Sequence, residues 1–146
     1  IMDAYLDVAY TDRSKFQWGF FAQNKKQTDA ELAAMKKRVD NKFPPAIKLE
    51  DYSGDYYNTV YGKISIAKSD NMLICRFQLH PDLIGYMQYM DNNEFQVTYS
   101  NIGYGIFPAK FSVKDGKAFA VIIKSNEFVE SDAYLFAKDP EGLMIR

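Results

Sequence analysis

The chain has 146 residues, which suits about one domain with a sizeable core. Hydrophobic residues make up 47% and charged residues 25%, a composition that excludes a disordered chain. The basic and acidic residues, 18 and 19, leave a formal net charge of −1 with no basic stripe, which argues against a nucleic-acid partner or an anionic membrane surface. No run of about 18 apolar residues occurs, so no membrane span is predicted.

The counts of aromatic residues, cysteine and histidine further limit the fold class and the possible cofactors. The aromatic share of 16%, with eleven Tyr and eleven Phe, favours pleated sheets over helices rich in Leu and Ala. The single cysteine, Cys75, excludes an internal disulfide, and with one histidine, His80, no metal-ligand spacing is present. We therefore expect no metal and no other cofactor. The chain opens on Ile1 without a charged signal-peptide region, as is typical of a fragment or a processed product.

Residues 1–45 have a helical apolar period. A short amphipathic helix is predicted over residues 1–10, and a second begins near Arg13 with Thr11 and Asp12 as its cap. Its apolar side consists of Phe16, Phe20 and Phe21, with Trp18 off that stripe. Thr28–Glu31 has the form of a capping box, which predicts a new helix to about Asn41. Its inward residues are Leu32, Met35 and Val39. Pro44 and Pro45 then end the helical segment.

After Pro45 the period becomes two, which is typical of strands with one buried face. The inward positions are Val60, Gly62, Ile64 and Ile66; Leu73, Cys75, Phe77 and Leu79; Phe95, Val97 and Tyr99; and Phe111 and Val113. Turns are predicted at 69–71, 91–93 and 115–116, because Asp, Asn and Gly tolerate positive φ. Further strands at about 52–57, 84–90, 117–124 and 133–138 bring the count to about eight.

The predicted fold is mainly β, α+β overall: an antiparallel β-barrel of about eight strands preceded by N-terminal helices. The helical segment covers residues 1–45, the barrel 46–140 and a C-terminal tail 141–146. A barrel of eight strands leaves room for side chains or for one small ligand.

Several segments resemble one family. They are 49–56, 61–66, Leu73, Leu79-His80-Pro81, Glu94-Phe95, Phe111 with Asp115-Gly116, and 134–138. Together they look like an uncharacterised domain that is appended to the C-terminus of β-lactamase-related, penicillin-binding-protein-like serine hydrolases. Ile1 to Tyr10 with Thr11-Asp12 is similar to the last helix of such a hydrolase and its linker. Pro81 departs from the pattern, which often has an aromatic residue after the histidine.

This resemblance implies a lipocalin-like barrel beside a serine-hydrolase domain of the same polypeptide. The chain would then be a non-catalytic accessory domain that shapes substrate access, stabilises the catalytic domain or mediates oligomer contacts. A bacterial, periplasmic or otherwise extracytoplasmic setting is also implied. The alternative is a lipocalin-like module that binds a small apolar ligand.

Two apparent catalytic motifs conflict with the predicted strands. Ser65–Lys68 matches Ser-x-x-Lys, and Tyr99-Ser100-Asn101 matches Tyr-x-Asn. The Ser-x-x-Lys chemistry needs both side chains on one face of a helix, whereas residues three apart in a strand point to opposite faces. We therefore expect both matches to be coincidental and predict no catalytic residue in this chain.

The candidate ligand-binding residues are side chains at a predicted barrel mouth, where a ring packs and a polar group faces solvent or ligand. They are Tyr52, Tyr56, Tyr61, His80, Tyr86 and Tyr99. Further tyrosines that could line the same mouth are Tyr57, Tyr89 and Tyr104. Ordinary packing of these rings is the competing interpretation. A weaker alternative makes His80 a general base oriented by Asp82.

Overall fold

The computed structural model describes residues 13–125 and 132–139. The chain divides into two compact units, residues 1–34 and 35–146. The division falls within helix α2, Arg13–Asp40. The helix expected over residues 1–10 and the tail 141–146 lie outside the described residues.

Helix α2 is continuous, so the predicted restart at Thr28–Glu31 is wrong. The segment contains no proline and a single glycine, Gly19, and nothing in it interrupts the backbone hydrogen bonds. Gln27 Nε2 donates to Glu31 Oε1 at 3.3 Å, a pairing one helical turn apart. Leu32, Met35 and Val39 are half-buried. Among the described helices, none is long and apolar enough to cross a membrane.

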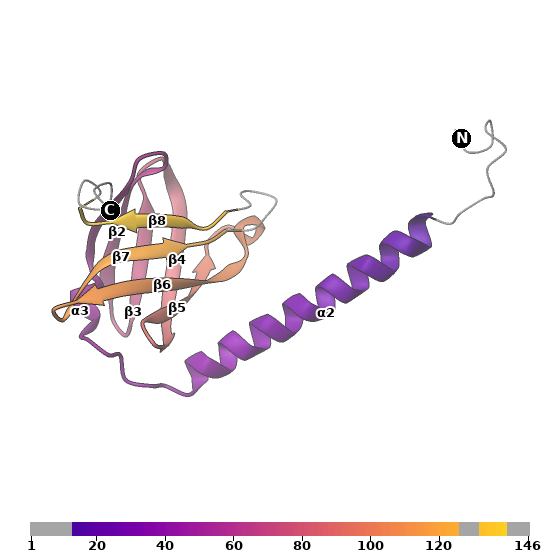
Figure 1. Ribbon diagram of the computed structural model, residues 1–146, viewed down its shortest axis with the longest axis horizontal. Coiled ribbons are helices and arrows are strands. Elements are labelled where there is room, and N and C mark those ends of the chain that lie inside the picture. The colour runs from indigo at the N-terminus through magenta and orange to yellow at the C-terminus, as the bar shows by residue number, and fades with distance from the viewer. Residues whose placement is uncertain (1–12, 126–131, 140–146) are drawn as a thin grey trace. The chain divides into compact units, whose positions relative to one another are not determined.

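In the described residues, antiparallel strands close into a barrel in chain order, each paired with its neighbours and β1 with β8 (Figure 1). The strands are β1 Gly54–Asn58, β2 Gly62–Ser69, β3 Met72–Phe77, β4 His80–Asp91, β5 Glu94–Tyr99, β6 Ile106–Lys114, β7 Lys117–Ile123 and β8 Tyr134–Ala137. A short helix, α3 Leu49–Tyr52, precedes β1, and a 3₁₀ turn, η1 Ile102–Tyr104, joins β5 to β6. The predicted antiparallel eight-stranded barrel is confirmed.

Three of the connections are tight hairpins at the predicted turns. Asp70 joins β2 to β3 with φ 52°, and Asn92 and Asn93 join β4 to β5 with φ 48° and 60°. Asp115 and Gly116 join β6 to β7 with φ 52° and 74°. These are the residue types that tolerate the left-handed region, and their positions therefore fix where each strand reverses.

The alternation of buried and exposed side chains is confirmed in the middle of the strands. The inward residues of β2, β3 and β5 are Ile64, Ile66, Leu73, Cys75, Phe95 and Val97, none more than 3% exposed. Phe111 on β6 is 2% exposed, but Val113 is only half-buried because the pairing of β6 with β7 shifts register between Ser112 and Val113.

Two predicted inward residues are exposed because they lie in turns. Val60 is 71% exposed, since the chain reverses before it: Asn58 Oδ1 accepts hydrogen bonds from the backbone N–H of Val60 at 2.8 Å and of Tyr61 at 3.0 Å. Leu79 is 60% exposed because β3 ends at Phe77, which pairs directly with His80 of β4. The period of two therefore holds only as far as the strand continues.

The two ends of the barrel differ. Consecutive strands are antiparallel, so the three tight hairpins lie at one end, together with the start of β1, since Gly54 pairs with Ile66 near the end of β2. Tyr52 of α3 fills this closed end, with ring contacts to Phe95 at 5.0 Å and Phe111 at 5.1 Å between centroids. The other end, which we call the mouth, consists of the connections after β1, β3, β5 and β7.

Arg38 joins the last turns of α2 to the β4–β5 hairpin at the closed end. Its Nε donates to Asp91 Oδ2 at 2.8 Å, and its Nη2 donates to Asp91 Oδ1 and, at 2.6 Å, to Glu94 Oε2. Hydrogen bonds from Arg38 hold the pKa of the Asp91 carboxyl below its usual range. This ion-pair cluster connects the C-terminal part of the helix to the barrel.

Candidate functional site

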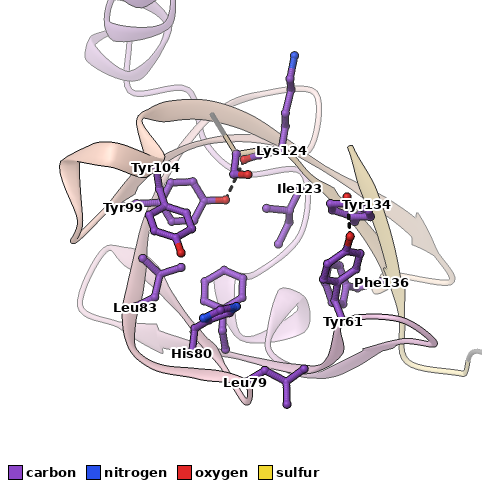
Figure 2. A pocket seen from close by; sticks show the side chains of 12 residues that line it. Tyr61, Leu79, His80, Leu83, Tyr99, Tyr104, Ile123, Lys124, Tyr134 and Phe136 are labelled. Carbon is purple, nitrogen blue, oxygen red and sulfur yellow. Dashed lines mark hydrogen bonds between the residues drawn. The ribbon is translucent and has the colours of Figure 1, made fainter. Parts of the chain in front are cut away.

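The mouth of the barrel contains an open cavity of about 250 Å³ (Figure 2). Its walls come from β3, β4, β5, β7 and β8 and from the connections between the strands at this end. Its lining residues Leu83, Tyr99, Ile123 and Phe136 also belong to the hydrophobic core cluster, so the cavity borders the packed interior of the barrel. A mostly apolar cavity with a few polar groups is the usual form of a small-molecule site.

Half of the twelve lining residues are tyrosines or phenylalanines. The rings are Tyr61, Phe77, Tyr99, Tyr104, Tyr134 and Phe136. Figure 2 shows Tyr99 and Tyr104 on one side of the cavity and Tyr61, Tyr134 and Phe136 on the other. Each side is a packed unit: Tyr61 and Tyr134 lie 4.0 Å apart between centroids, and Tyr99 and Tyr104 lie 5.9 Å apart. The cavity therefore has two aromatic walls with a gap between them.

Three of the four tyrosine hydroxyls have known partners. Tyr61 donates to the hydroxyl of Tyr134 at 2.7 Å, a bond that joins the β1–β2 connection to β8. Tyr99 donates to the backbone oxygen of Lys124 at 2.8 Å, and burial raises the pKa of Tyr99 above its ordinary value. These hydroxyls fix the rings in place, because a buried donor keeps the geometry that satisfies it.

Other polar groups at the cavity are better placed to bind a ligand than the three hydroxyls that are already hydrogen-bonded. The Tyr104 hydroxyl makes no hydrogen bond to any described residue, and Figure 2 shows it directed into the cavity. The His80 imidazole lies at the exposed rim near Leu83. Lys124 also lines the cavity, but its amino group points away, and lies 5.7 Å from the centroid of the Phe107 ring.

The structure brings three of the six candidate ligand-binding residues together, and Tyr104 lies with them. Tyr61, His80 and Tyr99 line the mouth cavity. Tyr52 and Tyr56, both 0% exposed, lie in the core instead. Tyr52 donates to Asn93 Oδ1 at 2.6 Å, and Tyr56 donates to the backbone oxygen of Tyr52 at 2.5 Å.

Tyr86 is 39% exposed on the outer face of β4, next to the buried Gly85 and Met87. Its position follows from the period of two, which places neighbours of inward residues on the outside. Sequence reasoning also missed Tyr134 and Phe136 as lining residues, although both lie in a predicted strand. Their place in the chain could have identified them, because β8 begins at the end of the barrel where the other mouth residues lie.

The apparent Ser-x-x-Lys match lies in β2, as expected. The Ser65 hydroxyl donates to Asp55 Oδ1 at 2.7 Å, while the Lys68 amine donates to the Glu50 carboxylate. The two side chains thus have separate acidic partners on different elements. In the second match, the Tyr99 hydroxyl donates to the backbone oxygen of Lys124. The side chain of Asn101 accepts a hydrogen bond from the backbone N–H of Gly103 at 2.9 Å.

The described part of the chain assembles neither a His–Asp general base nor a metal site. No hydrogen bond joins His80 to Asp82 there, and no group of three His, Cys, Asp or Glu side chains could hold a metal ion. Cys75 is buried, which raises the pKa of its thiol to about 12. No protein-family model, curated protein or solved structure matches the chain.

Proposed function

We propose that this chain is a non-catalytic accessory domain of a β-lactamase-related, penicillin-binding-protein-like serine hydrolase. Its role would be to shape substrate access, stabilise the catalytic domain or mediate oligomer contacts, in a bacterial and extracytoplasmic setting. The observation that carries this proposal is that residues of the family-like segments have structural roles in the barrel. Tyr52, Tyr56 and Phe111 form the aromatic core of the closed end, with Tyr56 and Phe111 6.0 Å apart between centroids.

The glycines of the same pattern have matching roles. Gly62 has φ 69° where β2 begins, and Gly116 has φ 74° in the β6–β7 hairpin. Most residues with a side chain are strained at such angles, so the backbone favours glycine at each of these positions. The family-like residues therefore form the framework of a barrel and include no set of catalytic side chains. This is the arrangement that we expect of an accessory domain.

The sequence that encodes the region upstream of residue 1 tests the proposal most directly. A Ser-x-x-Lys helix of a hydrolase domain in the same reading frame is the expected result. A complete short gene that starts near Met2 would refute the assignment.

A fluorescent penicillin tests whether the chain itself is inert. We expect no covalent label on the wild-type chain and none on Ser65→Ala. Label that reaches the wild type but not Ser65→Ala would show an acylated nucleophile at position 65 and contradict the non-catalytic role.

The mouth cavity favours a second candidate, a module that binds a small apolar ligand. A ligand present at 100 times its Kd raises the free energy of unfolding by about 2.7 kcal/mol, which is a shift of several degrees in Tm. A thermal screen with lipids, peptidoglycan fragments and aromatic compounds should contain such a ligand. An unchanged Tm across all three groups would count against this candidate.

A further inference from the structure

The size of the mouth cavity limits the ligand to about one or two rings. Apolar cavities of about 150 Å³ take up benzene, so a cavity of about 250 Å³ accommodates a larger molecule of similar shape. Ligand pockets for drug-sized compounds begin at about 300 Å³. A long acyl chain or a disaccharide would therefore extend out of this space.

The two aromatic walls favour a flat ligand. Rings prefer partners at offset or edge-on positions with centroids about 4.5–7 Å apart, and each of the two walls presents such partners to a planar ring. Tyr99 and Tyr61 are held by their hydroxyl bonds, so the walls are ordered before the ligand arrives. A rigid ring also loses less rotational freedom on binding than a flexible chain does.

The polar groups indicate a neutral ligand with one hydrogen-bonding substituent. Lys124, the lysine among the lining residues, points outward, and a buried ion without a partner is costly. The Tyr104 hydroxyl, in contrast, has no partner among the described residues and points inward. It can donate to a hydroxyl or carbonyl oxygen on the ligand, with His80 at the rim nearby.

We propose that the mouth cavity binds a flat, neutral aromatic ligand of one or two rings, with a hydroxyl or carbonyl group that accepts a hydrogen bond from Tyr104. This proposal rests on the small-ligand function suggested for the same cavity. The ring lies between the Tyr99–Tyr104 wall and the Tyr61–Tyr134 wall. The substituent contacts Tyr104 on the β5–β6 side.

1-Naphthol is a suitable probe, with naphthalene as its counterpart without the hydroxyl and 1-decanol as an aliphatic alcohol. In an NMR titration of the full chain, we expect 1-naphthol to bind with a Kd on the order of 100 µM. The amide shifts that change should belong to mouth residues such as Leu83, Tyr104 and Ile123. Shift changes confined to other surfaces would refute the site.

The variant Tyr104→Phe tests the hydrogen bond, because it removes the hydroxyl and keeps the ring. It should weaken 1-naphthol binding about 2- to 10-fold and leave naphthalene binding unchanged. The matched control is Tyr86→Phe, the same change on the outer face of the barrel, which should alter neither affinity. Equal binding of 1-naphthol to both variants would overturn the role of Tyr104.

The three compounds distinguish a failure of this proposal from a failure of the small-ligand binding function on which it rests. If 1-decanol binds at the mouth and 1-naphthol does not, the barrel is a ligand-binding module but the aromatic class is wrong. If none of the three compounds binds, the ligand-binding function fails as well. If 1-naphthol and naphthalene both bind at the mouth more tightly than 1-decanol, the aromatic class is supported.

Discussion

Tyr52 gives the sharpest test of how the closed end is stabilised. Its side chain is 0% exposed, its hydroxyl donates to Asn93 Oδ1 at 2.6 Å, and its ring contacts Phe95 and Phe111 edge-on. It thereby joins α3 to the β4–β5 hairpin and to β6. Two substitutions, Tyr52→Phe and Tyr52→Ala, separate the hydrogen bond from the packing of the ring.

The expected costs follow from what each substitution removes. Tyr52→Phe keeps the ring and leaves the Asn93 oxygen without its donor, which costs about 1–2 kcal/mol of unfolding free energy. Tyr52→Ala also removes the ring from a packed core, and the loss of a buried aromatic side chain costs about 3–5 kcal/mol. The full truncation should therefore cost about 4–7 kcal/mol, a large part of the stability of a domain of this size.

Urea unfolding followed by near-UV circular dichroism measures these costs in the barrel. Trp18 is the single tryptophan and lies 76% exposed on α2, so its fluorescence does not report on the barrel core. Tyr57, the neighbour of Tyr56 on β1, is 40% exposed and supplies the control. Tyr57→Phe should change stability by less than about 0.5 kcal/mol. If Tyr52→Phe and Tyr57→Phe cost the same, the buried hydrogen bond to Asn93 does not contribute as argued.

Three further predictions concern titratable groups. Burial raises the pKa of Tyr52 from 10.0 to about 12, so the stability it contributes is complete below pH 10 and is lost as pH rises toward 12. Tyr52→Phe should therefore flatten the alkaline fall in Tm. Arg38 lowers the pKa of Asp91, so this pair stabilises the fold above about pH 4 and the gain is lost as pH falls. Arg38→Met should lower Tm by about 2–4 °C at pH 7 and by less at pH 3; an equal loss at both would contradict the ion-pair argument. Cys75, with a thiol pKa raised to about 12, should react with a disulfide reagent at pH 8 at least about 100-fold more slowly when folded than in urea, and equal rates would show that its burial is wrong.

The strands and turns of the barrel could be predicted from sequence because each is decided locally. Alternation of apolar side chains identifies the strand, and an Asp, Asn or Gly at positive φ identifies where it reverses. Asp115-Gly116 is an example, since both residues adopt the angles that a two-residue hairpin needs. Antiparallel neighbours joined by short turns then leave few arrangements other than a closed sheet.

The errors lie where local signals compete. Thr28–Glu31 matches a capping box, but the same residues are good helix formers, and without a breaker the helix continues through them. Val60 matches the alternation of β2, but the side chain of Asn58 binds two backbone N–H groups and turns the chain first. A motif predicts a boundary only when nothing on either side favours continuing the same structure.

The tyrosines show why the candidate site was only half predictable. The period of two decides whether a side chain faces in or out, which suffices to place Tyr86 on the outer surface. It does not give the height of a residue along the barrel. Tyr56 and Tyr61 are five positions apart in sequence, yet one lies in the core and the other at the mouth, because β1 runs from the closed end to the mouth between them. In an up-and-down barrel, height follows from distance to the nearest hairpin. A residue near the β2–β3, β4–β5 or β6–β7 hairpin therefore belongs to the closed end, and a tyrosine near one of the connections after β1, β3, β5 or β7 is the better candidate for ligand binding.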